Sequence, residues 1–188
     1  MHAQMARRGD TAFVLLVKAD TERRRDQNSL FLTTWHSGTR SWGPLRLVQQ
    51  GREEGAVYPR LMLTRDGAMH AIWTQLGANV LRHMRSLDGG VTWSAATDLP
   101  VPGAYANAGF AIGDSAVGVL FDDPDTLGRW RLRIACWNGA WLPPLVIGEV
   151  RVGSPALLDS RSLSVIALRE NAQDPWQFHN VVATPQDH

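Results

Sequence analysis

The chain has 188 residues, of which 44% are hydrophobic and 20% are charged. This composition indicates a folded core and excludes an intrinsically disordered chain. The 19 Lys and Arg residues nearly balance the 18 Asp and Glu residues, so the net charge of +1 predicts neither nucleic-acid binding nor attraction to a membrane surface.

The cysteine content and the apolar runs bear on the cellular compartment. Cys136 is the single cysteine, so no internal disulfide can form. The apolar run at residues 12–17 is too short for a signal peptide or a transmembrane helix. The chain as given therefore predicts a cytoplasmic location by default, and secretion if the natural N-terminus lies further upstream.

Three tryptophans mark an internal repeat. Trp42, Trp93 and Trp141 follow one another at intervals of about 50 residues, and each precedes a short segment of small residues or proline and then an aliphatic run. A period of this size is typical of solenoids and propellers.

The second repeat shows its strands in chain order. Residues 60–64 and 68–74 are expected to form a hairpin around the Asp66-Gly67 turn, because a DG dipeptide between extended runs favours a tight turn. Residues 80–86 and 92–99 are expected to form the third and fourth strands, joined at Asp88-Gly89-Gly90. The unit is predicted to be a four-stranded meander.

The other repeats contain the same parts in the same order. Second strands are expected at residues 11–18, 115–121 and 162–168, and third strands at residues 30–35, 130–137 and 176–182. The predicted fold class is all-β, a β-propeller of four-stranded antiparallel blades within residues 1–50, 51–100, 101–150 and 151–188. A β-sandwich is the alternative, but it gives no reason to repeat one tryptophan position once per unit.

A complete motif lies in the second repeat. Residues 86–93 fit the pattern S-x-D-x-G-x-T-W, and through this motif the chain resembles the Asp-box (BNR) repeats of the sialidase superfamily. Residues 35–42 form a weaker copy and residues 137–141 a shortened one. The resemblance implies a six-bladed propeller in which these boxes lie on the face opposite the substrate site.

The residue types of the motif indicate a structural role. The carboxylate of Asp88 can accept hydrogen bonds from the backbone of its own turn, and glycine permits a positive φ. We therefore expect Asp88 to stabilise the turn and not to act as a catalytic acid. The box is formed by Ser86, Asp88, Gly90, Thr92 and Trp93. The repeated tryptophans at positions 42, 93 and 141 are expected to be core residues.

The opposite face is expected to carry any binding site, because loops that join second to third strands and blade to blade share that face. Charge gathers in those loops. The ligand-binding candidates there are Arg52, Glu53, Tyr105, Asn107 and Asp125.

The resemblance implies a specific catalytic set, namely three arginines that hold a substrate carboxylate, a tyrosine nucleophile assisted by a glutamate, and an aspartate acid/base. Arg60 and Tyr58 are the candidates for the first two roles, although Tyr58 recurs at Tyr105 as a repeated packing residue would. Asp122 and Asp123 are candidates for a general acid or a calcium ligand. A solvated turn at residues 122–125 is the favoured interpretation. The histidines show no metal-binding spacing, and neither a metal nor a cofactor is expected.

Two functions follow from these features. The first is a non-catalytic or incomplete sialidase-like propeller whose polar face binds a glycan or a protein. The alternative is a glycoside hydrolase of the exo-sialidase type whose catalytic set is completed by missing sequence or by a second subunit.

The number of blades predicts an open structure. Three full blades and most of a fourth fit within 188 residues, whereas six would need on the order of 300. We expect an arc that is part of a longer protein, or one that self-associates through its open blade edges.

Overall fold

The computed structural model describes residues 2–18, 28–51, 55–78, 80–101, 106, 108–112, 114–124, 130–148, 151–157, 163–169 and 177–183. These residues form β-strands and turns, with no helix among them and hence no helix that could cross a membrane. The prediction of an all-β fold is confirmed.

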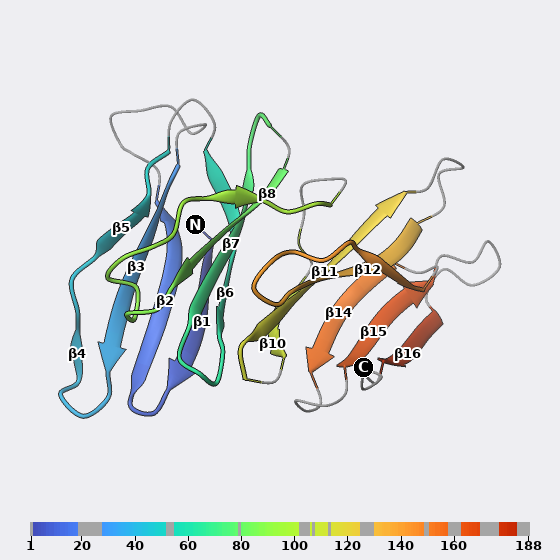
Figure 1. Cartoon of the computed structure of the whole chain (residues 1–188). Coiled ribbons are helices and arrows are strands. Elements are labelled where there is room, and N and C mark those ends of the chain that lie inside the picture. The colour runs from blue at the N-terminus through green and yellow to red at the C-terminus, as the bar shows by residue number, and fades with distance from the viewer. Residues whose placement is uncertain are drawn as a thin grey trace.

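The strands form four antiparallel sheets that follow one another along the chain (Figure 1). Sheet 1 contains β1 (Ala3–Arg8), β2 (Thr11–Lys18), β3 (Ser29–His36), β4 (Ser41–Trp42) and β5 (Arg46–Gln49). Sheet 2 contains β6 (Ala56–Leu63), β7 (Met69–Gln75), β8 (Val80–Ser86) and β9 (Thr97–Asp98). Sheet 3 contains β10 (Ala108–Ile112), β11 (Ala116–Pro124), β12 (Trp130–Trp137) and β13 (Leu145–Gly148). Sheet 4 contains β14 (Arg151–Leu157), β15 (Leu163–Arg169) and β16 (Gln177–Ala183).

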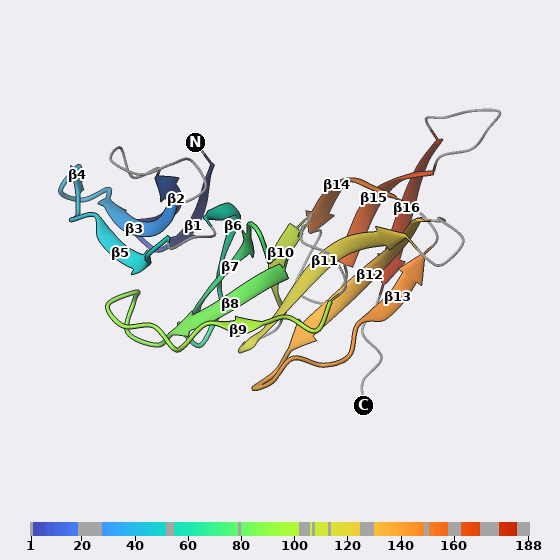
Figure 2. The same cartoon turned by 90° about the horizontal axis from the view of Figure 1, so that it is seen from above.

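Each sheet is a meander, as expected for the blades of an incomplete β-propeller. The sheets stand side by side in a row, with sheet 1 at one end and sheet 4 at the other (Figures 1 and 2). The first strand of each sheet packs against the preceding sheet: β6 against β1 and β2, β10 against β6, and β14 against β11 and β12.

The three marker tryptophans occupy equivalent positions in sheets 1 to 3. In each sheet, the residue after the tryptophan donates its backbone N–H to a carbonyl of the third strand. The pairs are Gly43 to Thr34 at 2.7 Å, Ser94 to Arg85 at 2.8 Å and Leu142 to Cys136 at 2.9 Å. This shared bond aligns the three repeats residue by residue.

A first core lies between sheets 1 and 2. Leu15, Leu30 and Leu32 of sheet 1 are at most 1% exposed and meet Met69 and Trp73 of sheet 2, which are completely buried. Burying side chains of this size is the main favourable term in folding.

A second core lies between sheets 2 and 3. Met62, Ile72 and Leu81 of sheet 2 pack with Val117 and Val119 of sheet 3. Sheet 2 is thus covered on both faces, and all seven residues of β7 are buried. A strand covered on both faces loses the polar alternation of a half-exposed one.

Three local expectations were wrong. The expected turn at residues 122–125 is not a turn at Asp122, Asp123 and Pro124, because β11 continues through all three. The expected fourth strand at residues 92–99 is reduced to β9. Trp42 is 61% exposed and is not a core residue, because none of the described sheets covers its side of sheet 1.

Candidate functional site

The turn between β8 and β9 is organised by the carboxylate of Asp88. The backbone N–H of Val91 donates to Oδ1 at 3.0 Å, and that of Thr92 donates to Oδ1 and Oδ2 at 2.9 and 3.0 Å. The hydroxyls of Thr92 and Ser86 donate at 2.6 and 2.8 Å. These hydrogen bonds hold the pKa of Asp88 well below its usual range, and the bond from the Thr92 hydroxyl contributes most.

The same turn is fixed against sheet 1. Ser86 is buried, and its hydroxyl accepts a hydrogen bond from the N–H of Gly90 at 2.8 Å. Gly90 has a φ of 82°, and a Cβ at this position would collide with the side chain of Leu32 in sheet 1. Asp88 is exposed but its oxygens are occupied by the turn, so its described contacts are those of a structural residue.

A bulge in β6 determines where the catalytic candidates Tyr58 and Arg60 lie. The pairing of β6 with β7 shifts between Val57 and Arg60, and Tyr58 has a φ of 51°. A left-handed backbone at a bulky residue is strained, and such strain concentrates at bulges and functional sites.

The Arg60 guanidinium bonds to the segment that precedes sheet 3. Its Nη2 donates to the carbonyl of Ala106 at 2.9 Å and its Nη1 to the carbonyl of Pro59 at 3.1 Å. Burial lowers its pKa. A Cβ at Gly109 of β10 would lie 2.8 Å from the sulfur of Met62 and 3.5 Å from the Cβ of Arg60, so a glycine allows β10 to approach β6 closely.

Tyr58 contacts the N-terminal segment that precedes sheet 1. Its ring meets that of His2 at a centroid distance of 4.7 Å, edge to face, and its side chain is 39% exposed. Residues two positions apart on a regular strand share a face. Across this bulge, however, Tyr58 contacts the N-terminal segment and Arg60 contacts Ala106. Tyr58 therefore contacts the segment before β1, and Arg60 contacts the segment before β10.

The remaining candidates are placed as follows. Asp122 and Asp123 are neighbours on β11, where the backbone pairs them with Leu132 and Arg131. Within the described residues no three His, Cys, Asp or Glu side chains could hold a metal ion together. Five candidates lie outside the described residues: Arg52, Glu53, Tyr105, Asn107 and Asp125.

The structure brings together two histidines that the sequence spacing did not connect. His70 on β7 and His83 on β8 are 0% and 4% exposed, and Nδ1 of His70 lies 2.9 Å from Nε2 of His83. One ring N–H donates and the other nitrogen accepts. Desolvation lowers the pKa of His70 to about 4 and that of His83 to about 3, so both rings are neutral near pH 7.

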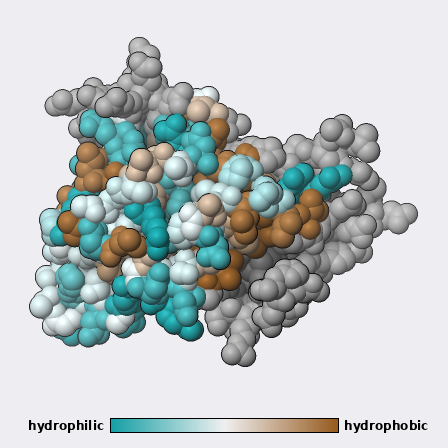
Figure 3. Space-filling view, in the orientation of Figure 1, coloured by the Kyte–Doolittle hydropathy of each residue, from teal (hydrophilic) through white to brown (hydrophobic). Residues whose placement is uncertain are grey.

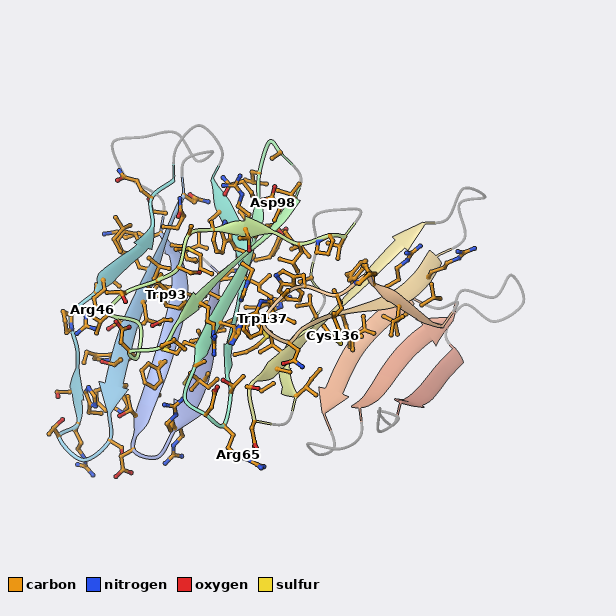
Figure 4. The ribbon with its side chains drawn as sticks, viewed as in Figure 1. Arg46, Arg65, Trp93, Asp98, Cys136 and Trp137 are labelled. Carbon is orange, nitrogen blue, oxygen red and sulfur yellow. The ribbon has the colours of Figure 1, made fainter. Side chains whose placement is uncertain are left out.

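Two tryptophans of the third repeat pack on this pair, and Figure 4 labels one of them, Trp137. Trp137 meets His70 edge to face at 4.8 Å, and Trp141 meets His83 at 5.1 Å. The guanidinium of Arg85 lies 4.8 Å from the Trp137 ring, a cation–π contact that adds positive charge beside the histidines.

The hairpin register is the signal that could have connected the two histidines. His70 pairs with Arg85 across β7 and β8, and His83 lies two residues before Arg85, so all three share one face. In sheet 1 the equivalent positions are held by Phe13 and Leu32, both apolar. A buried polar pair therefore replaces an apolar one at this interface.

Turns of neighbouring sheets bond to each other at one edge of the molecule. The turns joining β1 to β2 and β6 to β7 lie at the lower edge of Figure 1, and Figure 4 shows Arg65 there and Asp98 near the upper edge. Arg65 bonds to Asp114 of the next sheet at 3.1 Å, and Asp66 donates its N–H to the Asp114 carbonyl at 2.9 Å. These turn-to-turn bonds link sheets 2 and 3.

Comparison with solved structures shows the fold. A protein of unknown function from Dyadobacter fermentans DSM 18053 aligns with a TM-score of 0.66 and 19% identity, over 90% of this chain and 50% of that one. A point mutant of the NanB sialidase from Streptococcus pneumoniae aligns at 0.54 with 14% identity, over 95% of this chain and 29% of that one. A structure of NanB with Optactamide aligns with a TM-score of 0.52 and 13% identity, over 90% of this chain and 28% of that one.

The likeness is one of fold, and the chain spans half the length of the first of these proteins and less than a third of the NanB sialidase. No protein-family profile matches the sequence. No curated protein matches it either.

Proposed function

We propose that the chain is a non-catalytic Asp-box propeller arc of the sialidase type, whose loop-bearing face binds a glycan or a protein. The observation that carries this is the turn at Asp88, in which each fixed polar position of the motif makes a hydrogen bond within the turn. The sialidase-like fold supports the class of protein that we propose. Whether the protein is catalytic depends on its site residues and not on its fold.

The placement of the catalytic candidates supports a non-catalytic protein. An arginine that grips a substrate carboxylate needs a guanidinium free to present two parallel N–H donors. The nitrogens Nη1 and Nη2 of Arg60 each donate one N–H to a backbone carbonyl, and these two bonds hold the guanidinium against Pro59 and Ala106. Tyr58, the nucleophile candidate, packs against His2 on the side of the N-terminal strand.

The binding face is proposed to be the edge that holds the end of β2, the start of β3, and the β7–β8 connection. Lys18 pairs with Ser29 and Gln75 with Val80, which places these strand ends at one edge of their sheets (Figure 1). Loops on a rigid scaffold are where binding residues concentrate. The Asp88 turn lies at the other end of β8.

The alternative is an exo-sialidase-like glycoside hydrolase whose catalytic set is completed outside the described residues. The NanB fold likeness favours it. The two proposals differ in turnover, because a binding arc leaves a sialoside intact.

A fluorogenic sialoside assay on the full chain separates them. We expect no release of fluorophore above background, together with saturable binding to a glycan array or to a captured protein ligand. The matched variants are Arg60→Ala and Arg82→Ala, the second removing an arginine of β8 that pairs with Asp98. Turnover that disappears in Arg60→Ala and persists in Arg82→Ala, with both variants folded, would establish the hydrolase instead.

A further inference from the structure

Sheet 1 carries an apolar face on the side away from sheet 2. Met5, Ala12, Val14, Trp35 and Trp42 line a hollow of about 260 Å³ on this face. Met5 is 69% exposed and Trp42 is 61% exposed. We call this surface the open face of sheet 1.

The repeat shows what such a face does elsewhere in the chain. Trp35, Ser86 and Trp137 hold the same position near the end of the third strand in sheets 1, 2 and 3. Their partners on the second strand are Ala12, Met69 and Val117, in that order. Met69 and Val117 are completely buried against the preceding sheet, whereas Ala12 is only half-buried. Two residues along each strand, Ala71 and Val119 are likewise 0% exposed, and their equivalent is Val14.

The tryptophans repeat the contrast. Trp93 packs on the core between sheets 1 and 2, and Trp141 packs on His83 of sheet 2. Each therefore covers part of the sheet that precedes its own. Trp42 holds the same position in sheet 1 and contacts Trp35 of its own sheet, with ring centroids 5.2 Å apart.

The outer strand extends the open face. Leu45 and Leu47 are 47% and 51% exposed, and Figure 3 shows apolar side chains gathered over β5. The equivalent of Leu45 in sheet 2 is Ala96, which packs on the core between sheets 1 and 2. A repeat that caps an array presents a polar outer face, and the open face is apolar instead.

We propose that the open face of sheet 1 is an interface for a second copy of this chain, which docks head to tail as if it were the preceding sheet. The hollow is lined by aliphatic and aromatic side chains, a lining that suits a packed sheet. In both cores within the chain, the face of a sheet that corresponds to the open face packs against the preceding sheet, on the face of that sheet that is turned the other way. A contact of that form is heterologous, so it joins unlike ends of the two copies.

The test is the oligomeric state of the full chain over a concentration series, by light scattering after size exclusion and by sedimentation velocity. Met5→Glu places a charge on the open face, and Leu87→Glu places one at a residue that is 72% exposed in the Asp88 turn. Both positions are exposed, so both variants should fold, which circular dichroism checks.

We expect the wild-type chain to associate as concentration rises and Met5→Glu to weaken this association about tenfold or more, with Leu87→Glu matching wild type. A chain that stays monomeric throughout, or an equal effect of both variants, would overturn the proposal. Oxidation of a Met5→Cys variant that also carries Cys136→Ser tests the arrangement, because position 5 then holds the one cysteine of the chain. A disulfide-linked dimer would mean that two open faces meet, which contradicts docking head to tail.

Discussion

Lowering the pH should destabilise this fold through His70 and His83, well before the carboxylates titrate. Both rings are buried between sheets 2 and 3, bonded to each other and close to Arg85. Adding a proton there would place a charge in a desolvated site that already faces a guanidinium. The folded protein resists this protonation, while the unfolded chain accepts the proton near pH 6.5.

The direction of the effect follows from linkage. A histidine whose pKa is lowered by folding contributes its full stabilisation above the unfolded value of 6.5 and loses it as the pH falls toward the folded value. For His70, a pKa of about 4 in place of 6.5 corresponds to about 3 kcal/mol of unfolding free energy. With His83 titrating in the same window, the slope should approach about 2.7 kcal/mol per pH unit near pH 5.

Urea unfolding at a series of pH values measures this directly. The comparison is the double variant His70→Phe with His83→Leu, which installs the apolar pair that sheet 1 carries at Phe13 and Leu32. Replacing a buried polar pair by apolar residues of similar size is often neutral for stability. The single variant His83→Leu should retain part of the slope.

The unfolding free energy of the wild type should fall between about pH 6.5 and pH 5. In the double variant this fall should be absent. Carboxylates remain largely ionised in this window, so their contribution is small. If the difference in stability between wild type and the double variant did not change with pH, the histidine pair would not be the cause.

Other changes test the packing. Asp88→Ala should lower the melting temperature without altering any glycan binding, because the N–H and hydroxyl of Thr92 lose their acceptor; lost binding at unchanged melting would contradict this. Trp93→Ala should reduce the unfolding free energy by about 3 kcal/mol and Trp42→Ala by less than about 1 kcal/mol, so equal losses in urea titrations would refute the difference in burial. Gly90→Ala should lower the melting temperature further than Gly89→Ala, because both glycines have positive φ but only Gly90 faces Leu32; equal shifts would argue against that contact.

The architecture was predictable because its signals are local. Turn dipeptides such as Asp66-Gly67 and a tryptophan recurring at one position identify a meander and its repeat without knowledge of long-range contacts. The burial of Trp42 was mispredicted for the opposite reason. Burial depends on which sheet lies alongside, and the repeat pattern is the same whether or not that sheet is present.

The candidate site was less predictable, because strand irregularities determine it. Tyr58 and Arg60 are two residues apart and would share a face on a regular strand, but the bulge in β6 separates their contacts. His70 and His83 are 13 residues apart, and only the register of β7 with β8 shows that they meet. Neither the bulge nor the register is encoded in residue type alone.

The complete burial of β7 has a consequence for how the molecule opens. A strand covered on both faces can exchange its amide hydrogens only when a neighbouring sheet has moved away, so its exchange reports the most costly opening of the structure. Among the described cores, sheet 1 is covered on one face, by sheet 2, so its strands in the monomer should exchange at lower cost. Local opening is therefore expected to reach sheet 1 before it reaches β7 in sheet 2.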